Sequence, residues 1–199
     1  MRTISMCTAI AGLLTAAACS DEGGRLDESE VITTVMLSFA PSTGDPITAE
    51  IDDPDGDGGA PPTIDPVNLA ATTTYALTVR FQNRLEDPPE EITDEIAQEG
   101  QHHLLLFTGS AVVGPATTNA SGALTQSYGD VDVNGLPIGL TNTITTATGT
   151  GQLIVTLRHM PPEAPPVKSA TTLDTVKTSG IDALGGSTDA QVTFDVTVP

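Results

Sequence analysis

The sequence predicts an all-β protein: an antiparallel sandwich of two sheets, immunoglobulin-like (Ig-like) in architecture, with one short helix near residues 89–99. Three observations support this fold class. Threonine and valine are abundant, and tryptophan is absent. The 19 glycines and 15 prolines interrupt the chain regularly, as turns between short strands do. Several short segments carry apolar residues at every second position, which is the period of a half-buried strand. Seven or eight such strands are typical of a sandwich.

The expected strands follow one another along most of the chain. The first begins at Val31, where alternate residues through Phe39 suit one face, and Pro41 ends it. Alternation is clearest over residues 75–82. The mostly apolar run 104–113 is typical of a central strand. The remaining expected strands cover residues 47–51, 128–133, 141–146, 153–157 and 192–198.

One segment, residues 88–100, has a helical pattern instead. Two prolines stand at its start, acidic residues fill the first turn, and Gly100 is placed to end it. Ile92 and Ile96 are four residues apart, so both can pack on the sandwich. We therefore expect a helix of two to three turns across one end of the domain, with these acids on another side: Glu91, Glu95 and Glu99.

The N-terminus has the layout of an export signal. Arg2 provides a positive charge, residues 10–14 are apolar, and small residues lead into Cys19. This arrangement resembles the lipobox of bacterial lipoproteins, although Ala16 stands where leucine is usual. The resemblance implies that residues 1–18 are a lipoprotein signal peptide and that Cys19 is lipid-modified. An ordinary signal peptide cut near Ala18 is the alternative.

Cysteine usage agrees with lipidation. The only other cysteine, Cys7, lies in the segment that would be removed, so the mature chain has no internal disulfide. Residues 19–30 are then the lipidated cysteine and a flexible, polar stalk, and residues 31–199 form the sandwich domain. By the sorting rule of enteric bacteria, Ser20 followed by Asp21 implies the outer membrane. The domain would lie on its periplasmic or cell-surface side.

The chain is strongly acidic, with 26 acidic and 7 basic residues and a net charge of −19. Such a charge repels nucleic acid and anionic lipid, so we expect no nucleic-acid partner and a membrane association that depends on the lipid anchor. It is compatible with cations.

Two acidic turns have the spacing of the first half of a calcium loop, in which alternate oxygens converge on the ion. Each is followed by a glycine, but the twelfth positions are Ile64 and Thr141, which excludes an EF-hand. The alternative is that these are ordinary turn residues. The candidate calcium ligands are Asp53, Asp55 and Asp57 in the first turn and Asp130, Asp132 and Asn134 in the second.

The histidines provide a second candidate metal site. Two directly follow the expected helix, and the third closes the expected strand 153–157 on the same face as Leu157. Imidazoles from separate segments with a nearby carboxylate can bind zinc or iron. Histidines at strand ends are otherwise common as semi-polar rim residues. The candidate ligands are Glu99, His102, His103 and His159, with Glu95 as another carboxylate.

Signatures of catalysis are missing from the sequence. It contains no GxSxG, HExxH, phosphate-loop or dinucleotide-binding motif. Only four phenylalanines and two tyrosines are present, too few for the stacking platforms of a carbohydrate-binding groove. We therefore expect a protein that is not an enzyme.

Several stretches resemble a family of small bacterial envelope lipoproteins described as having a type 1 periplasmic-binding fold. The resemblance implies a place near outer-membrane receptors of the TonB-dependent kind, and it matches His102 and His159 to family histidines. The implied fold has two α/β lobes, whereas the residue pattern predicts strands with a single helix. The stretches are Val31–Val35, DPDGDGGAPPTI (53–64), LEDPPEEITDEI (85–96), NGLPIGLTNTITT (134–146) and LIVTLRHMPP (153–162).

Together these observations predict a lipid-anchored, non-catalytic binding or accessory domain of the cell envelope. Divalent cations in its acidic turns, with calcium as the first candidate, are a hypothesis that goes with this prediction. One alternative is a metal-binding or delivery lipoprotein that carries zinc or iron beside an outer-membrane receptor. The other is a purely structural or adhesive surface domain.

Overall fold

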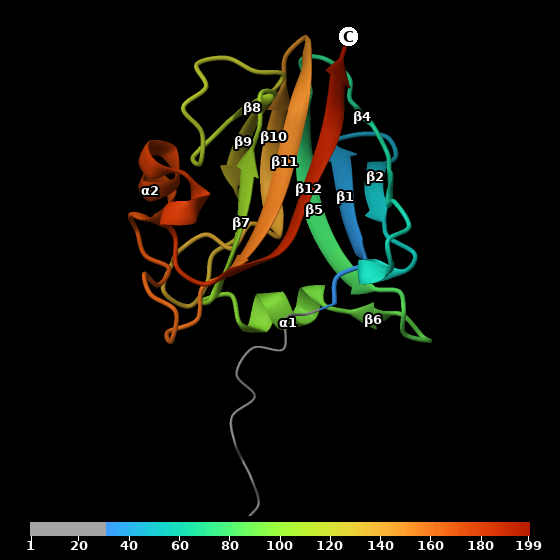
Figure 1. Cartoon of the computed structure of the whole chain (residues 1–199). Helices are drawn as coiled ribbons and strands as arrows, with labels where there is room; N and C mark the ends of the chain where they lie inside the picture. Colours follow the sequence, from blue (N-terminus) through green and yellow to red (C-terminus); the bar gives the residue numbers. More distant parts are fainter. Residues whose placement is uncertain (1–30) are drawn as a thin grey trace, which may run out of the picture.

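The computed structural model describes residues 31–199. The predicted signal peptide, Cys19 and the stalk therefore lie outside the described residues. Within them, two β-sheets pack face to face and enclose a common core (Figure 1). The predicted all-β sandwich is confirmed. The two α/β lobes implied by the family resemblance are not the architecture of the described residues.

The larger sheet has eight strands in the spatial order β3-β2-β1-β5-β10-β9-β8, with β6 beside β5. Its pairings are antiparallel except for that of β8 with β9. Its strands are β1 (Thr34–Pro41), β2 (Ile47–Asp52), β3 (Thr63–Ile64), β5 (Thr74–Asn83), β6 (Glu90–Glu91), β8 (Val112–Val113), β9 (Leu124–Tyr128) and β10 (Thr141–Thr146).

The smaller sheet has four strands in the order β4-β12-β11-β7, and only β4 and β12 run parallel. Its strands are β4 (Val67–Asn68), β7 (His103–Thr108), β11 (Gly149–His159) and β12 (Ser187–Val198). The helical segments are α1 (Thr93–Gln98), α2 (Thr172–Ser179) and the short 3-10 turns η1 (Gly56–Gly58) and η2 (Ile181–Ala183).

Strand alternation produces the main core. Inward-facing residues of β5 and β12 are buried, and the residues between them are mostly exposed. The largest buried side chains of this core are Phe39, Tyr75, Phe81, Phe107 and Phe194. The expected alternation over residues 75–82 and 192–198 is thus present in the structure.

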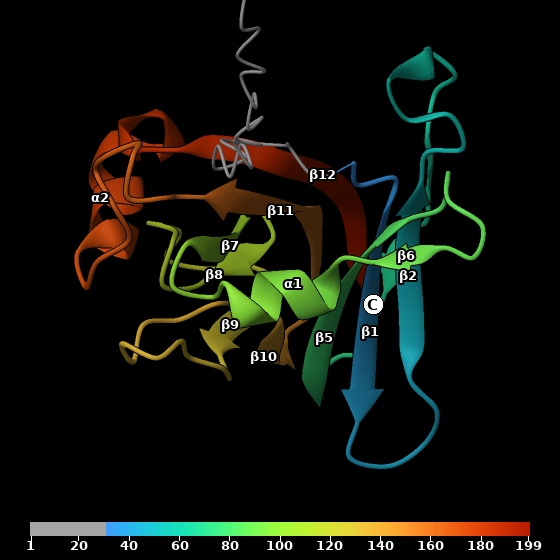
Figure 2. The same cartoon turned by 90° about the horizontal axis from the view of Figure 1, so that it is seen from below.

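Helix α1 crosses one end of the sandwich (Figures 1 and 2). Ile92 and Ile96 are buried in the main core, as their spacing predicts. The hydroxyl oxygen of Thr93 accepts the Phe81 backbone N–H at 2.8 Å, which joins the start of the helix to β5. The helix is shorter than expected because Glu90–Glu91 pairs with the end of β5 as a strand.

The apolar run 104–113 does not form a central strand. It contains β7, at the edge of the smaller sheet, and the short β8 of the other sheet. The run is apolar because both faces of β7 are covered. Leu105 faces the main core, whereas Leu104 and Leu106 belong to a second cluster with residues of the α2 region. The sequence pattern did not predict α2.

The segment 128–133 also differs from its prediction. Strand β9 ends at Tyr128, and residues 129–140 form a connection closed by the isolated bridge between Val131 and Pro137. The carboxylates of Asp130 and Asp132 accept backbone N–H groups later in the chain, which folds this connection back on itself.

The outermost strands of both sheets are mostly short. Edge strands β3, β4 and β8 have two residues each. The longer edge strand, β7, has bonds on its free side at Leu105: the Leu105 N–H donates to the Ile138 carbonyl at 2.7 Å, and the Leu105 carbonyl accepts the Tyr128 hydroxyl at 2.8 Å. Strand β4 pairs only with Val196 and Thr197 of β12, so within residues 31–199 the earlier part of β12 has a strand partner on its β11 side alone.

Candidate metal centre

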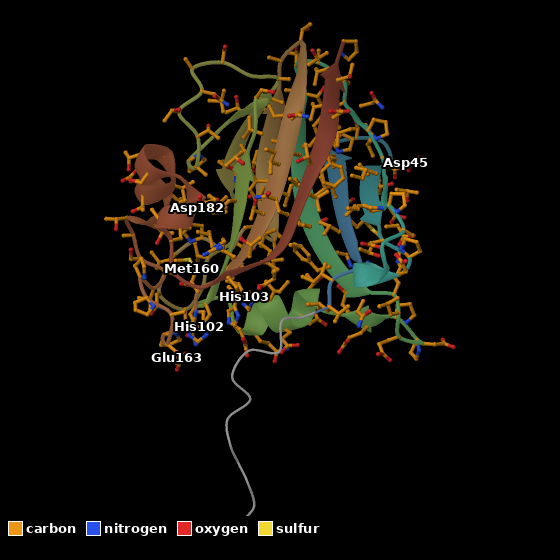
Figure 3. The ribbon with its side chains drawn as sticks, in the orientation of Figure 1. Asp45, His102, His103, Met160, Glu163 and Asp182 are labelled. Atoms are coloured by element: carbon orange, nitrogen blue, oxygen red, sulfur yellow. The ribbon has the colours of Figure 1, made fainter. Side chains whose placement is uncertain are left out.

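The structure brings together Glu99, His103 and His159, each with one possible ligand atom within 4.8 Å of the others. This group lies at the end of the sandwich that α1 crosses, where β7 begins and β11 ends. Figure 3 shows His103 at this end of the molecule, beside α1. Among the described residues it is the one group of three or more histidine, cysteine or carboxylate side chains with such spacing.

The pairing of β7 with β11 places the two histidines side by side. His103 is the first residue of β7 and lies directly opposite His159, the last residue of β11. Their rings stack with centroids 4.7 Å apart and planes 11° from parallel. Strand alternation puts His103 on the same face as Leu105, and His159 on the same face as Leu157.

A tight turn after α1 brings Glu99 to the histidines. The Glu99 N–H closes the helix on the Glu95 carbonyl at 2.9 Å, and the Glu99 carbonyl accepts the His102 N–H at 2.7 Å. The His103 Nδ1 lies 3.3 Å from the same Glu99 carbonyl oxygen. Glu99 is exposed, His103 is buried and His159 is half-buried, so the group reaches from the interior to the solvent.

The environment of His103 favours its neutral form. Burial is the main cause that lowers the pKa of His103 from 6.5 to about 4, and nearby His159, His102 and Lys168 lower it further. The hydrogen bond to the Glu99 carbonyl acts in the opposite direction. His103 is therefore uncharged at neutral pH, which is the form of imidazole that binds metal ions.

This low pKa predicts a pH-dependent stability. Once unfolded, His103 regains its ordinary pKa, so between pH 6.5 and about 4 the unfolded chain binds more protons than the folded one. Its contribution to the free energy of unfolding is complete above pH 6.5 and is lost as the pH falls through about 4. The loss reaches about 3 kcal/mol. Urea unfolding at a series of pH values should show this slope in the wild type and a smaller slope in H103N. H102N removes only one of the smaller causes of the shift and should keep most of the wild-type slope. Equal slopes in H103N and wild type would contradict the assignment.

The three donors suit a borderline transition metal better than calcium. Two imidazole nitrogens with one carboxylate are ligands that zinc and neighbouring first-row metals accept, whereas calcium takes oxygen ligands. With bonds of about 2.0 Å in a tetrahedral site, donor atoms lie about 3.3 Å apart, so the group must close by about 1.5 Å at most. Because the nitrogen lone pairs lie in the planes of two stacked rings, one imidazole must also turn for both to meet the same ion. Glu99 is exposed and half-buried His159 is the less enclosed of the two histidines. Three protein ligands leave a position for water or for a donor from a partner.

His102 is not part of this group. Its backbone has structural contacts instead, because its N–H binds the Glu99 carbonyl and its carbonyl accepts the Met160 N–H at 2.6 Å. The family resemblance matched His102 to a family histidine, but the structure pairs His103 with His159. Residues two apart on a strand face the same side, so His103 faces the same side as Leu105, whereas His102 precedes the strand. This spacing is the signal in the sequence that favours His103 over His102 as a ligand.

The carboxylates of the second acidic turn bind the protein itself. Asp130 accepts the N–H groups of Gly139 at 2.7 Å and Thr141 at 3.0 Å. Asp132 accepts the N–H groups of Asn134 and Leu136 and pairs with the ammonium group of Lys168 at 2.9 Å. Burial opposes the charge of Asp132, but the hydrogen bonds from Lys168, Leu136 and Asn134 outweigh it and lower the pKa of Asp132. These contacts agree with the interpretation of Asp130, Asp132 and Asn134 as turn residues.

The first acidic turn is more exposed. Asp55 accepts the Ala60 N–H at 3.1 Å, and Asp53 lies 3.5 Å from the Asp55 N–H. The side chain of Asp57 lies outside the described residues. Neither turn forms a three-residue ligand group among the side chains that the structure describes, and calcium binding there stays a prediction.

One residue near the histidines was not predicted. Asp189 of β12 places its Oδ2 atom 4.0 Å from the Nε2 atom of His103, and the side chains of His103 and Asp189 are 3% and 4% exposed. Nothing in the sequence around Asp189 indicates this, because two strands must be aligned before it can reach His103.

Comparison of this chain with models of protein families, with curated proteins and with solved structures finds no match. Over residues 31–199, none of the helices has the length and apolar character needed to cross a membrane.

Proposed function

We propose that this protein is a lipid-anchored, non-catalytic accessory domain of the bacterial envelope that binds one divalent transition-metal ion at Glu99, His103 and His159. The observation that carries the proposal is that these three donors lie within 4.8 Å of one another, two from the turn between α1 and β7 and one from the end of β11. Zinc is the ion of first choice, because two imidazoles and a carboxylate form a common zinc ligand set.

The graded exposure of the site favours exchange of the metal over permanent storage. His103 is buried and held in its neutral form, while Glu99 is exposed. The Glu99 carboxylate can dissociate from the ion without disturbing the core. A ligand atom of a partner protein can then take its place on the metal. This suits the delivery function that we expected as an alternative, in which an outer-membrane receptor of the TonB-dependent kind receives the metal.

Zinc titration of the purified domain tests the proposal. We expect isothermal titration calorimetry to show one equivalent of zinc bound to the wild type. The variant H159A should lose affinity by more than about 100-fold, since removal of even a second-shell partner weakens metal binding by about 10- to 100-fold. Elemental analysis of protein purified from its native membrane should find near one equivalent of a transition metal.

The variant H102A is the matched control, because it removes an imidazole one residue away and leaves the three donors in place. It should bind zinc as the wild type does. A wild type that binds no zinc, or equal losses in H102A and H159A, would contradict the proposed site. A calcium titration of the same samples tests the acidic turns separately, since H159A should not change it.

A further inference from the structure

We propose that Lys168 and Asp132 join in an intramolecular isopeptide bond: the Lys168 side-chain nitrogen forms an amide with the Asp132 carboxyl group, and one water molecule leaves. The inference goes beyond the proposed function, because it assigns a covalent modification that uses none of the three metal-donor side chains. The bond would tie the connection 129–140 to the segment that leads from β11 to α2.

The two reacting groups are in contact in the interior of the protein. The Lys168 Nζ atom lies 2.9 Å from the Oδ2 atom of Asp132, and the two side chains are 2% and 1% exposed. Intramolecular reactions gain most in rate when the reacting groups are held in contact, with the reacting atoms about 3–3.5 Å apart. Burial also keeps water away from the pair, so hydrolysis of the finished amide is hindered.

The contact between the two groups is close but poorly aligned for a hydrogen bond. Among residues 31–199, the Oδ2 atom of Asp132 has no partner with hydrogen-bond geometry, although Nζ is 2.9 Å away. A hydrogen bond to a carboxylate lies near the lone pairs of its oxygen. An amine that approaches the carboxyl carbon makes a misaligned contact with the oxygen, as is found here.

The other contacts of Lys168 orient its nitrogen. The Nζ atom donates to the carbonyl oxygens of Gly100 at 2.7 Å and His103 at 2.9 Å. The ammonium form has three N–H groups for its three neighbours, which holds the pair together before the reaction. The neutral amine has two N–H groups for the two carbonyls, so its lone pair points toward the third neighbour, which is Asp132.

Backbone groups activate the carboxyl group of Asp132. Its Oδ1 atom accepts the N–H groups of Asn134 at 2.8 Å and Leu136 at 3.0 Å. When nitrogen adds to the carboxyl carbon, negative charge develops on Oδ1, and two donors fixed in this way stabilise it as an oxyanion hole does. Both donors bind Oδ1, so Oδ2 is the oxygen that leaves.

The reaction balances within the pair. A proton passes from the Lys168 ammonium group to Oδ2, which gives a neutral amine and a carboxylic acid. The bond between Nζ and the Cγ atom of Asp132 forms, and the bond between Cγ and Oδ2 breaks. A second proton from the nitrogen leaves with Oδ2 as water, and the amide keeps one hydrogen. Two buried charges disappear, which removes the cost of their desolvation.

Mass spectrometry of the denatured wild-type protein tests the bond, because denaturation separates an ion pair but not an amide. We expect trypsin to leave residues 85–158 and 159–177 joined in one species, lighter than the two separate peptides by one water molecule. Within these ranges the only internal cleavage site is Lys168, which the amide blocks. Fragmentation of the joined species should locate the bond at Lys168 and Asp132. A free peptide 159–168 in its place would overturn the inference.

The chain offers an internal control and two control variants. Lys177 lies 3.9 Å from Asp174 in an exposed pair, so trypsin should cleave after Lys177 as usual. K168R keeps a cation but has no amine, and D132A has no carboxyl group at this position. Both should give separate peptides with no loss of water. A joined species that persists in D132A would also overturn the inference, and the wild-type result decides even if a variant does not fold.

Discussion

Replacing Lys168 by methionine should lower the free energy of unfolding by about 3–5 kcal/mol, because it leaves a buried carboxylate without its cation. The Lys168 ammonium group lies 2.9 Å from Asp132 and also donates to the carbonyl oxygens of Gly100 at 2.7 Å and His103 at 2.9 Å. The side chains of Lys168 and Asp132 are 2% and 1% exposed. Burial lowers the pKa of Lys168, and its contacts with Asp132 oppose this effect.

The expected loss can be measured by urea denaturation at pH 7. Lys177 provides the matched control, since its partner Asp174 is 3.9 Å away, and their side chains are 33% and 77% exposed. K177M should change stability by less than about 0.5 kcal/mol. The double variant K168M/D132N removes both charges and should recover part of the loss. A loss in K168M no larger than that in K177M would contradict a buried, stabilising pair.

Replacing Gly186 by alanine is the second change with a large expected effect. Gly186 has a backbone φ of +73°, and a Cβ atom there would lie 1.7 Å from the His159 carbonyl oxygen. The chain around 185–187 or the end of β11 must therefore move. We expect a loss of about 3 kcal/mol or more from strain and overpacking together. Zinc affinity should also fall, because His159 is a proposed ligand.

A comparison with Gly180 distinguishes backbone strain from overpacking. It has a similar φ of +82°, but nothing lies within 4 Å of the position that a Cβ would take. G180A should lose only about 1–2 kcal/mol, from backbone strain, and should bind zinc normally. Thermal and urea unfolding of both variants give the comparison. If G186A and G180A lost equal stability, the contact of the new Cβ atom with the His159 carbonyl would not be the cause of the loss in G186A.

Local patterns were sufficient to predict much of the fold. Alternation located β1, β5, β11 and β12 because one face of each is buried in the main core. The opposite face is largely exposed only in β5 and β12. It misplaced the run 104–113, where β7 is covered on both faces. The α2 region covers the second face of β7. The buried residues of α2 are Thr172 and Val176, which form too weak an apolar pattern to predict a helix from residue spacing.

The candidate site was predicted in part. The sequence supplied Glu99, His103 and His159 as ligands, but it could not choose between adjacent histidines without the register of β7 and β11. Asp189 depends on a bulge, which changes the register after Leu157 and leaves no mark in the residue pattern. The acidic turns illustrate the opposite case, because the spacing of Asp130 and Asp132 also serves hydrogen bonds to the backbone.

The uneven cover of the sheet edges has a consequence for many copies of this domain held close together. A lipid tail would concentrate such copies in one plane, where unpaired backbone groups of one molecule can pair with a strand of the next. Three outermost strands have only two residues, and Leu105 of the fourth already bonds Ile138 and Tyr128. Within residues 31–199 the outer side of β12 before Val196 has no strand partner, so β12 is where we expect neighbouring molecules to associate first.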